Sequence, residues 1–125
     1  MGAWNELWLM RFRVSNITRG AVLAERAERA ETFWGRLKGL LGRSRLCGGE
    51  GLHITPCRSI HTFFMRFPID VLFLDEGGTV LRISSALAPW HTLVCMRATS
   101  ALELPAGTAA ASGTQPTDVL EFELC

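Results

Sequence analysis

Six short apolar runs fill the chain after the glycine-rich stretch CGGEG, and they restrict the fold more than any other feature of the sequence. The runs contain many β-branched and aromatic residues, and Gly, Pro, Asp or Ser residues separate them, which is typical of strands joined by turns. DEGG after Leu74 predicts a hairpin loop, because glycine adopts positive φ without steric cost. The predicted strands are residues 52–55, 60–65, 69–74, 79–84, 100–104 and 119–124.

The first 42 residues predict two more strands and a helix. Apolar and basic residues partly alternate over residues 7–14, and residues 21–26 suit a second strand, although Ala, Glu and Arg favour helix. Over residues 32–42, Phe33, Leu37, Leu40 and Leu41 form an apolar stripe on one face of a helix.

We therefore expect one mainly β domain over residues 1–125, a β-barrel or β-sandwich with one short helix near its N-terminal third. The small and polar segment 106–117 is expected to be a long loop with room for one helical turn. A chain of 125 residues with 48% hydrophobic residues can bury a core without metal or disulfides.

Charge is divided unevenly along the chain. The formal net charge is +1, but it is about +5 over residues 1–47 and about −4 over residues 48–125, from nine basic and four acidic against four basic and eight acidic side chains. The basic residues of segment 36–45 are typical of a solvated helix flank, and a phosphate contact there is the less favoured alternative. Nucleic acid is therefore not the expected partner.

The amino terminus does not read as a signal peptide, because Asn5 and Glu6 interrupt its apolar residues and Arg11 follows. No run approaches the roughly 18 apolar residues of a membrane-spanning helix. We expect a cytoplasmic protein without a membrane span, in which the cysteines are thiols. These cysteines are Cys47, Cys57, Cys95 and Cys125.

Asp70 is the most informative polar residue. In IDVLFLD, its neighbours are apolar in both alternating directions, so the strand is expected to be buried on both faces. A carboxylate there must have partners or take up a proton. The expected partners are His61, Thr62, Arg66 or backbone amides of the FMRFP bend. Asp70 then either fastens a bend between strands or takes part in ligand binding or proton transfer.

Cys57 and His61 are the nearest candidates for metal binding or nucleophilic catalysis. In an extended strand, residues four apart lie about 13 Å from each other, too far to share one zinc ion or to form a nucleophile and base pair. A buried structural thiol is the favoured interpretation of Cys57. A hydrogen-bonded core or rim residue is the favoured interpretation of His61.

Glu103 is a second carboxylate among apolar residues, between Leu102 and Leu104. Paired with Asp70, it could supply a general acid and a general base, and His61 could take its place. The separation that such chemistry needs cannot be obtained from the sequence.

Four segments resemble, in order and spacing, the bacterial and archaeal family called domain of unknown function 192; they are RLKGLLGR, GEGLHITPC, SIHTFFMRFPIDVLFLD and LELPAG. The resemblance covers residues 7–124 and implies a compact, mainly β fold with a helix near its start and no established enzyme activity. The residues marked in that family fall here on Gly39, Leu40, Arg43, Gly51, Ile60, His61, Met65, Asp70, Asp75, Glu103 and Gly107.

The chain departs from the family pattern at two positions. The family often has a basic residue in place of His91 and glycine in place of Thr117, so the PWH segment and the last turn stay open. Many relatives are exported or tethered to a membrane, so the expected cytoplasmic location rests on this sequence alone.

We expect a binding or accessory module whose partner is an unknown protein or a small polar ligand, and which is a monomer or a weak dimer. No cofactor, metal site or catalytic residue is assigned. The alternative is a hydrolase or isomerase that uses Asp70 with Glu103 or His61 as acid and base. The predicted ligand-binding residues are Cys57, Ser59, His61, Thr62, Met65, Arg66, Asp70 and Glu103.

Overall fold

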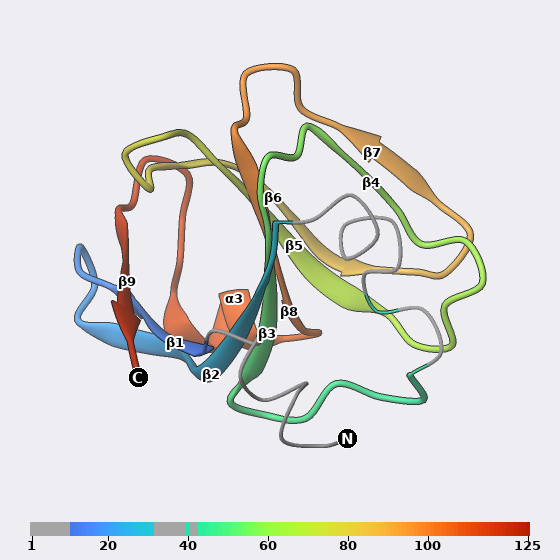
Figure 1. The fold of residues 1–125 in the computed structure, drawn as a ribbon, viewed down its shortest axis with the longest axis horizontal. Coiled ribbons are helices and arrows are strands. Elements are labelled where there is room, and N and C mark those ends of the chain that lie inside the picture. The colour runs from blue at the N-terminus through green and yellow to red at the C-terminus, as the bar shows by residue number, and fades with distance from the viewer. Residues whose placement is uncertain (1–10, 32–39, 41–42) are drawn as a thin grey trace.

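The computed structural model describes residues 11–31, 40 and 43–125, and this part of the chain is mainly β (Figure 1). The described elements are β1 (Arg11–Asn16), β2 (Ala21–Ala30), β3 (Glu50–Ile54), β4 (Ser59–His61), β5 (Ile69–Leu74), β6 (Val80–Leu87), β7 (Thr92–Val94), β8 (Ser100–Pro105), α3 (Thr108–Ser112) and β9 (Leu120–Leu124).

A seven-stranded sheet in the order β6-β5-β8-β3-β2-β1-β9 forms the body of the molecule. Its pairs are antiparallel except for β2 and β3, which are parallel. The sheet curls strongly into a half-barrel, so that its two edges meet near a bridge between Thr79 and Val119. The N–H of Leu120 also donates to the carbonyl oxygen of Gly78 at 2.9 Å.

Gly78 has a specific role where the edges meet. Its φ is 84°, and a Cβ atom there would lie 2.5 Å from the Leu120 carbonyl oxygen. Only glycine permits both this backbone conformation and this close approach.

The sheet separates two hydrophobic cores. The inner core lies inside the curl, since it joins Val80 next to one edge to Leu120 at the other, with Leu72 and Leu104 between them. The outer core lies on the opposite face and includes Phe73. All six residues of β5 are buried, because this strand lies between β6 and β8 and contributes to both cores.

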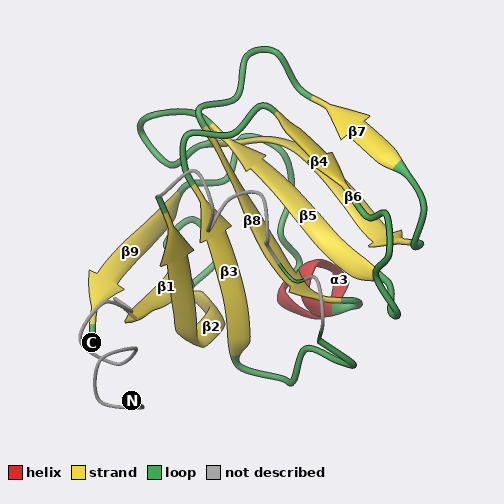
Figure 2. Cartoon of the chain, turned by 45° about the vertical axis from the view of Figure 1, so that its right-hand side comes forward, coloured by secondary structure: helices red, strands yellow, loops and turns green. Residues whose placement is uncertain are grey.

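Smaller elements cover both cores. The short helix α3 contacts β2, β6 and β8, and its Ala109 belongs to the inner core. β4 and β7 pair into a separate two-stranded sheet on the β5–β6 side of the molecule (Figure 2). Ile60 of β4 belongs to the outer core, and Leu93 of β7 packs against it.

Most of the predicted strands are confirmed. The predicted strand 69–74 coincides with β5, and strands 52–55, 79–84, 100–104 and 119–124 correspond to β3, β6, β8 and β9. Strand 21–26 continues to Ala30, because parallel pairing with β3 outweighs the helix preference of Ala, Glu and Arg. The fold class is therefore mainly β, with a half-barrel sheet.

Other predictions need correction or concern residues outside the described part of the chain. The strand predicted at 60–65 ends at His61, and the short strand β7 was missed. The helix predicted at 32–42 lies outside the described residues except for Leu40, and residues 7–10 of the first strand also lie outside them. The described helix is α3, within the loop where one helical turn was expected.

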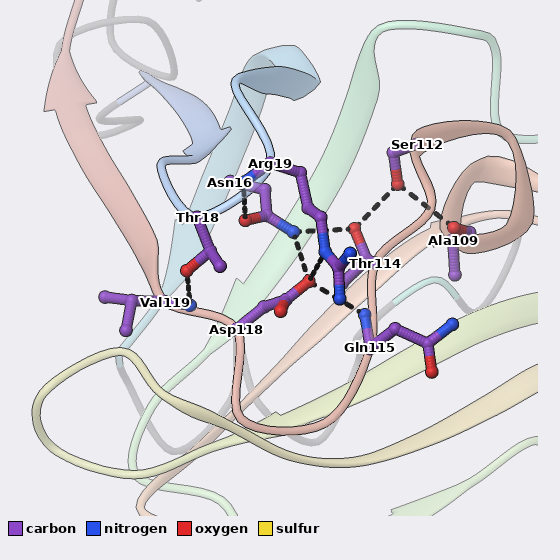
Figure 3. A network of polar contacts seen from close by, with 9 residues as sticks. All are labelled: Asn16, Thr18, Arg19, Ala109, Ser112, Thr114, Gln115, Asp118 and Val119. Carbon is purple, nitrogen blue, oxygen red and sulfur yellow. Dashed lines mark hydrogen bonds and ion pairs between the residues drawn. The ribbon is translucent and has the colours of Figure 1, made fainter.

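A buried polar network fastens the β1–β2 turn to the loop before β9 (Figure 3). Asn16 Nδ2 donates to Thr114 Oγ1 and to Asp118 Oδ2, each at 3.0 Å, and Arg19 Nε donates to the same Asp118 oxygen at 2.9 Å. The hydrogen bonds from Arg19 and Asn16 lower the pKa of Asp118 to about 2. Thr117 has φ 81°, in the left-handed region that favours glycine.

Candidate functional site

Asp70 is fully buried on the inner face of the sheet, opposite Leu104 of β8. Its Oδ1 accepts the N–H of Ala86 and its Oδ2 accepts the N–H of Ala109, both at 2.8 Å. Backbone amides were expected as partners, but their assignment to the FMRFP bend was wrong. His61, Thr62 and Arg66 make no hydrogen bond to this carboxylate among the described contacts. Asp70 thus joins β5 to the end of β6 and to α3.

Thr62 is also fully buried and holds residues 86–91, here called the 86–91 segment. Its Oγ1 donates to the Ala88 carbonyl oxygen at 2.7 Å and accepts a hydrogen bond from the backbone N–H of His91 at 2.9 Å. Its own N–H donates to the His91 carbonyl oxygen at 2.8 Å. Because Asp70 binds Ala86 and Thr62 binds Ala88 and His91, two buried side chains fix this segment.

Four ring side chains form an exposed row beside these contacts. The ring of His61 lies 5.3 Å from Phe63, Phe63 lies 6.0 Å from Trp90, and Trp90 lies 4.7 Å from Phe64, measured between centroids. Phe64 is 71% exposed and Trp90 is 60% exposed. The backbone N–H of Trp90 donates to the Thr62 carbonyl oxygen at 2.9 Å. We call His61, Phe63, Phe64 and Trp90 the aromatic patch.

The remaining predicted residues of the central block are dispersed. Cys57 is partly buried, and its thiol donates to the Ser59 carbonyl oxygen at 3.1 Å. Met65 is buried in the outer core, whereas Arg66 is exposed. Since Asp70 lies on the inner face, the structure does not gather the predicted residues around it.

Glu103 lies on the opposite face of the sheet from Asp70. In the β5–β8 pair, Asp70 is opposite Leu104 and Val71 is opposite Glu103, and side chains directly opposite each other share a face. The proposed acid and base pair of Asp70 and Glu103 is therefore wrong. The register of β5 and β8 decides this, and no feature within either strand specifies it.

The Glu103 carboxyl group is itself unusual. It is 3% exposed, and its Oε1 has no hydrogen-bond partner among the described residues. Burial raises the pKa of Glu103 to about 8, so the side chain is protonated and neutral at pH 7.

Phe63, Phe64 and Trp90 were not predicted from the sequence as site residues. A strand over residues 60–65 would turn Phe63 and Phe64 to opposite faces, so at most one would be exposed. Because β4 ends at His61, both phenylalanines are exposed. Trp90 follows Ala88 and Pro89 in a segment with no strand or helix signal.

Two further observations concern metal and membrane. Within residues 11–31, 40 and 43–125, no three His, Cys, Asp or Glu side chains are grouped so that they could hold a metal ion. No helix of that same part of the chain has the length and apolar character needed to span a bilayer. The four cysteines are thiols.

Comparison with known proteins identifies relatives over most of the chain. The model of the family DUF192, described as "Uncharacterized ACR, COG1430", matches residues 14–122. A "UPF0127 protein" of Thermococcus sibiricus is 36% identical over an alignment of 84 positions that covers 63% of this chain and 53% of that protein. The chain therefore spans about half the length of that curated relative.

Two solved structures have a similar fold. A protein of unknown function from Novosphingobium aromaticivorans is 26% identical with a TM-score of 0.78, covering 90% of this chain and 84% of that one. A protein from Sinorhizobium meliloti, described as a putative transcription regulator, is 24% identical with a TM-score of 0.79, covering 91% and 93%. The second similarity concerns the fold alone.

Proposed function

The chain belongs to the DUF192 family, and we propose that it is a binding module that docks an acidic segment of a partner protein on the aromatic patch. The observation that carries the proposal is the exposed row formed by Phe63, Phe64 and Trp90. Contiguous exposed aromatic side chains on a small protein are typical of interaction sites.

Backbone strain supports this proposal. Phe64 has φ 65° and Trp90 has φ 68°, a left-handed conformation that bulky residues rarely adopt. Each such residue costs about 1 to 3 kcal/mol and persists only where its surroundings fix it. Thr62 fixes Trp90 through the hydrogen bond to its N–H. The fold thus holds large apolar rings in water at a cost, which favours a functional surface over an accidental one.

Charge indicates an acidic partner. Segments 57–69 and 81–102, which include β4, β7 and most of β6, contain four arginines and two histidines but no Asp, Glu or Lys. The four arginines are exposed; they are Arg58, Arg66, Arg82 and Arg97. Aromatic residues, Met and Arg are the residue types enriched in protein interfaces, and Met96 of segment 81–102 is 68% exposed.

The rings favour a protein over single-stranded nucleic acid as the partner. Phe64 and Trp90 meet at 60°, and Phe63 and Trp90 meet at 31°, so the rings pack on one another. A platform for stacked bases needs open ring faces instead. The similarity to the putative transcription regulator does not change this preference, because it concerns the fold.

In this proposal, Asp70 and Thr62 are positioning residues. They form hydrogen bonds with the backbone of the 86–91 segment, which contains Trp90. His61 belongs to the surface itself, and Ser59 and Arg66 lie beside it along the chain. The hydrolase or isomerase alternative has no comparable support, since Glu103 lies on the opposite face of the sheet from Asp70, and the exposed His61 makes no hydrogen bond to Asp70 among the described contacts.

A displayed library of random short peptides tests the proposal. Selected on the wild-type protein and depleted on a Phe64→Ser, Trp90→Ala double variant, it should yield peptides with Asp or Glu beside apolar residues. Trp90→Ala should weaken their binding about 30-fold, because truncating a central aromatic residue costs about 2 kcal/mol. Ile17→Ser removes an apolar side chain of similar exposure from the β1–β2 turn and should change nothing.

Three outcomes would overturn the proposal. One is the absence of enriched acidic peptides, and another is equal affinity for wild-type protein and the double variant. The third is binding that depends on the aromatic patch but occurs only with phosphatidylglycerol vesicles or single-stranded RNA, since the partner would then belong to another class.

A further inference from the structure

A cavity of about 590 Å³ opens inside the curl, at the end where β5 passes into the hairpin turn 75–78. The helix α3 lies toward the other end, where β5 begins at Ile69 and Asp70 binds Ala109. The volume is within the range of pockets for small organic ligands, about 300 to 1,000 Å³. The side chains that give the cavity its character are Arg29, His53, Leu74, Ser100, Leu120 and Phe122.

His53 provides a hydrogen-bond donor without a partner. Arg29 Nε donates to His53 Nδ1 at 3.0 Å, so Nδ1 is an acceptor and the ring proton of the neutral imidazole is on Nε2. Burial and then the charge of Arg29 lower the pKa of His53 to about 4, which keeps the ring neutral. Nε2 is buried and has no hydrogen-bond partner among the described residues. A buried N–H of this kind is unfavourable until an acceptor reaches it.

Arg29 provides a guanidinium group that no carboxylate of the described residues contacts, although the charge of Glu31 acts on it from beyond ion-pair distance. Its guanidinium group lies 3.7 Å from the ring centroid of Phe12 and 5.5 Å from that of Phe122, and the His53 ring lies 4.4 Å from Phe122. Within the described ranges, no carboxylate forms an ion pair with Arg29 at 4.0 Å or less. Nε is used by His53, so the two terminal nitrogens can still bind both oxygens of a carboxylate.

The other walls restrict the ligand further. Leu74, Leu120 and Phe122 offer apolar surface to a small organic body. Asp75 and Glu76 also line the cavity, on the side of the hairpin turn, and would repel a second negative charge. The walls therefore favour one negative charge at Arg29 and an apolar remainder.

We propose that this cavity binds a small organic monocarboxylate, whose carboxylate accepts hydrogen bonds from the Arg29 guanidinium group and from His53 Nε2. This site is inside the curl, whereas the aromatic patch is on the outside. A result that contradicts one of the two proposals therefore leaves the other unaffected.

Nitrogen NMR of the His53 ring tests this proposal, with benzoate, phenylacetate and hexanoate as probes and their primary amides as controls. Each carboxylate should shift the Nε2 signal in a saturable manner, and at least one should bind about tenfold more tightly than its amide, since charge-assisted hydrogen bonds contribute about 1.5 to 3 kcal/mol. Arg29→Gln should abolish this preference. Arg13→Gln changes an exposed arginine of β1 and should preserve it.

Two results would overturn the proposal. One is a His53 signal that no carboxylate moves at concentrations of several millimolar. The other is equal binding of acid and amide to the wild-type protein. Both use the wild-type protein alone, so they remain decisive if Arg29→Gln fails to fold.

Discussion

Replacing Asp70 by alanine should lower the free energy of unfolding by about 3 to 5 kcal/mol, because it leaves the buried N–H groups of Ala86 and Ala109 without an acceptor. The loss arises from burial, since water cannot replace a carboxylate that is fully enclosed. Urea unfolding followed by circular dichroism measures it. After a loss of this size, a domain of ordinary stability would have only a small free energy of unfolding left.

Asp75→Ala is the matched control for this substitution. Asp75 Oδ1 also accepts two backbone N–H groups, from Gly77 at 3.0 Å and Thr79 at 2.9 Å, but its side chain is partly exposed. Water can satisfy these amides after the substitution, so the expected cost is about 1 kcal/mol. Equal costs at Asp70 and Asp75 would contradict the role given to the buried carboxylate.

Glu103→Gln should remove the contribution to stability that weakens as pH rises. The pKa of Glu103 is about 8 in the folded protein against 4.5 for an exposed glutamate, so the folded state binds more protons between these values. The contribution of Glu103 to wild-type stability therefore falls as pH rises from about 4.5 to 8, by about 1.4 kcal/mol per pH unit. Glutamine is neutral throughout and should remove this contribution.

The comparison needs unfolding free energies at pH 5 and pH 8. The variant and wild type should be similar at pH 5, and the variant should be more stable by roughly 3 to 4 kcal/mol at pH 8. Contributions from other groups, such as His53, cancel in the difference. Glu121→Gln alters an exposed residue of β9 and should follow the wild type at both pH values. A Glu103→Gln curve parallel to the wild-type curve would show that the carboxyl group is not buried.

The burial of Asp70 could be predicted from the sequence because it depends on one strand. Apolar residues on both sides of IDVLFLD predict a strand covered on both faces, and β5 is buried throughout. The partners of Asp70 could not be predicted in the same way. Ala86 and Ala109 lie 16 and 39 positions further along the chain. Only the order of the strands in the sheet and the position of α3 bring their backbone N–H groups to the carboxylate.

The aromatic patch and the cavity could not be predicted from the sequence for a similar reason. The strand pattern at 60–65 placed Phe63 and Phe64 on opposite faces, but β4 ends early and β7 pairs with it from a distant segment. His53 and Arg29 come together through the parallel pairing of β2 and β3, a contact that neither segment specifies alone. Local patterns predict strands, whereas sites depend on pairing between strands.

Mapping an acidic peptide on the isotope-labelled protein tests the central claim most directly, namely that the aromatic patch docks an acidic segment of a partner protein. With a peptide from the selection, we expect the largest backbone and ring shifts at His61, Phe63, Phe64 and Trp90, and unchanged signals at His53. Shifts spread evenly over the surface, or largest shifts away from these four residues, would contradict the account.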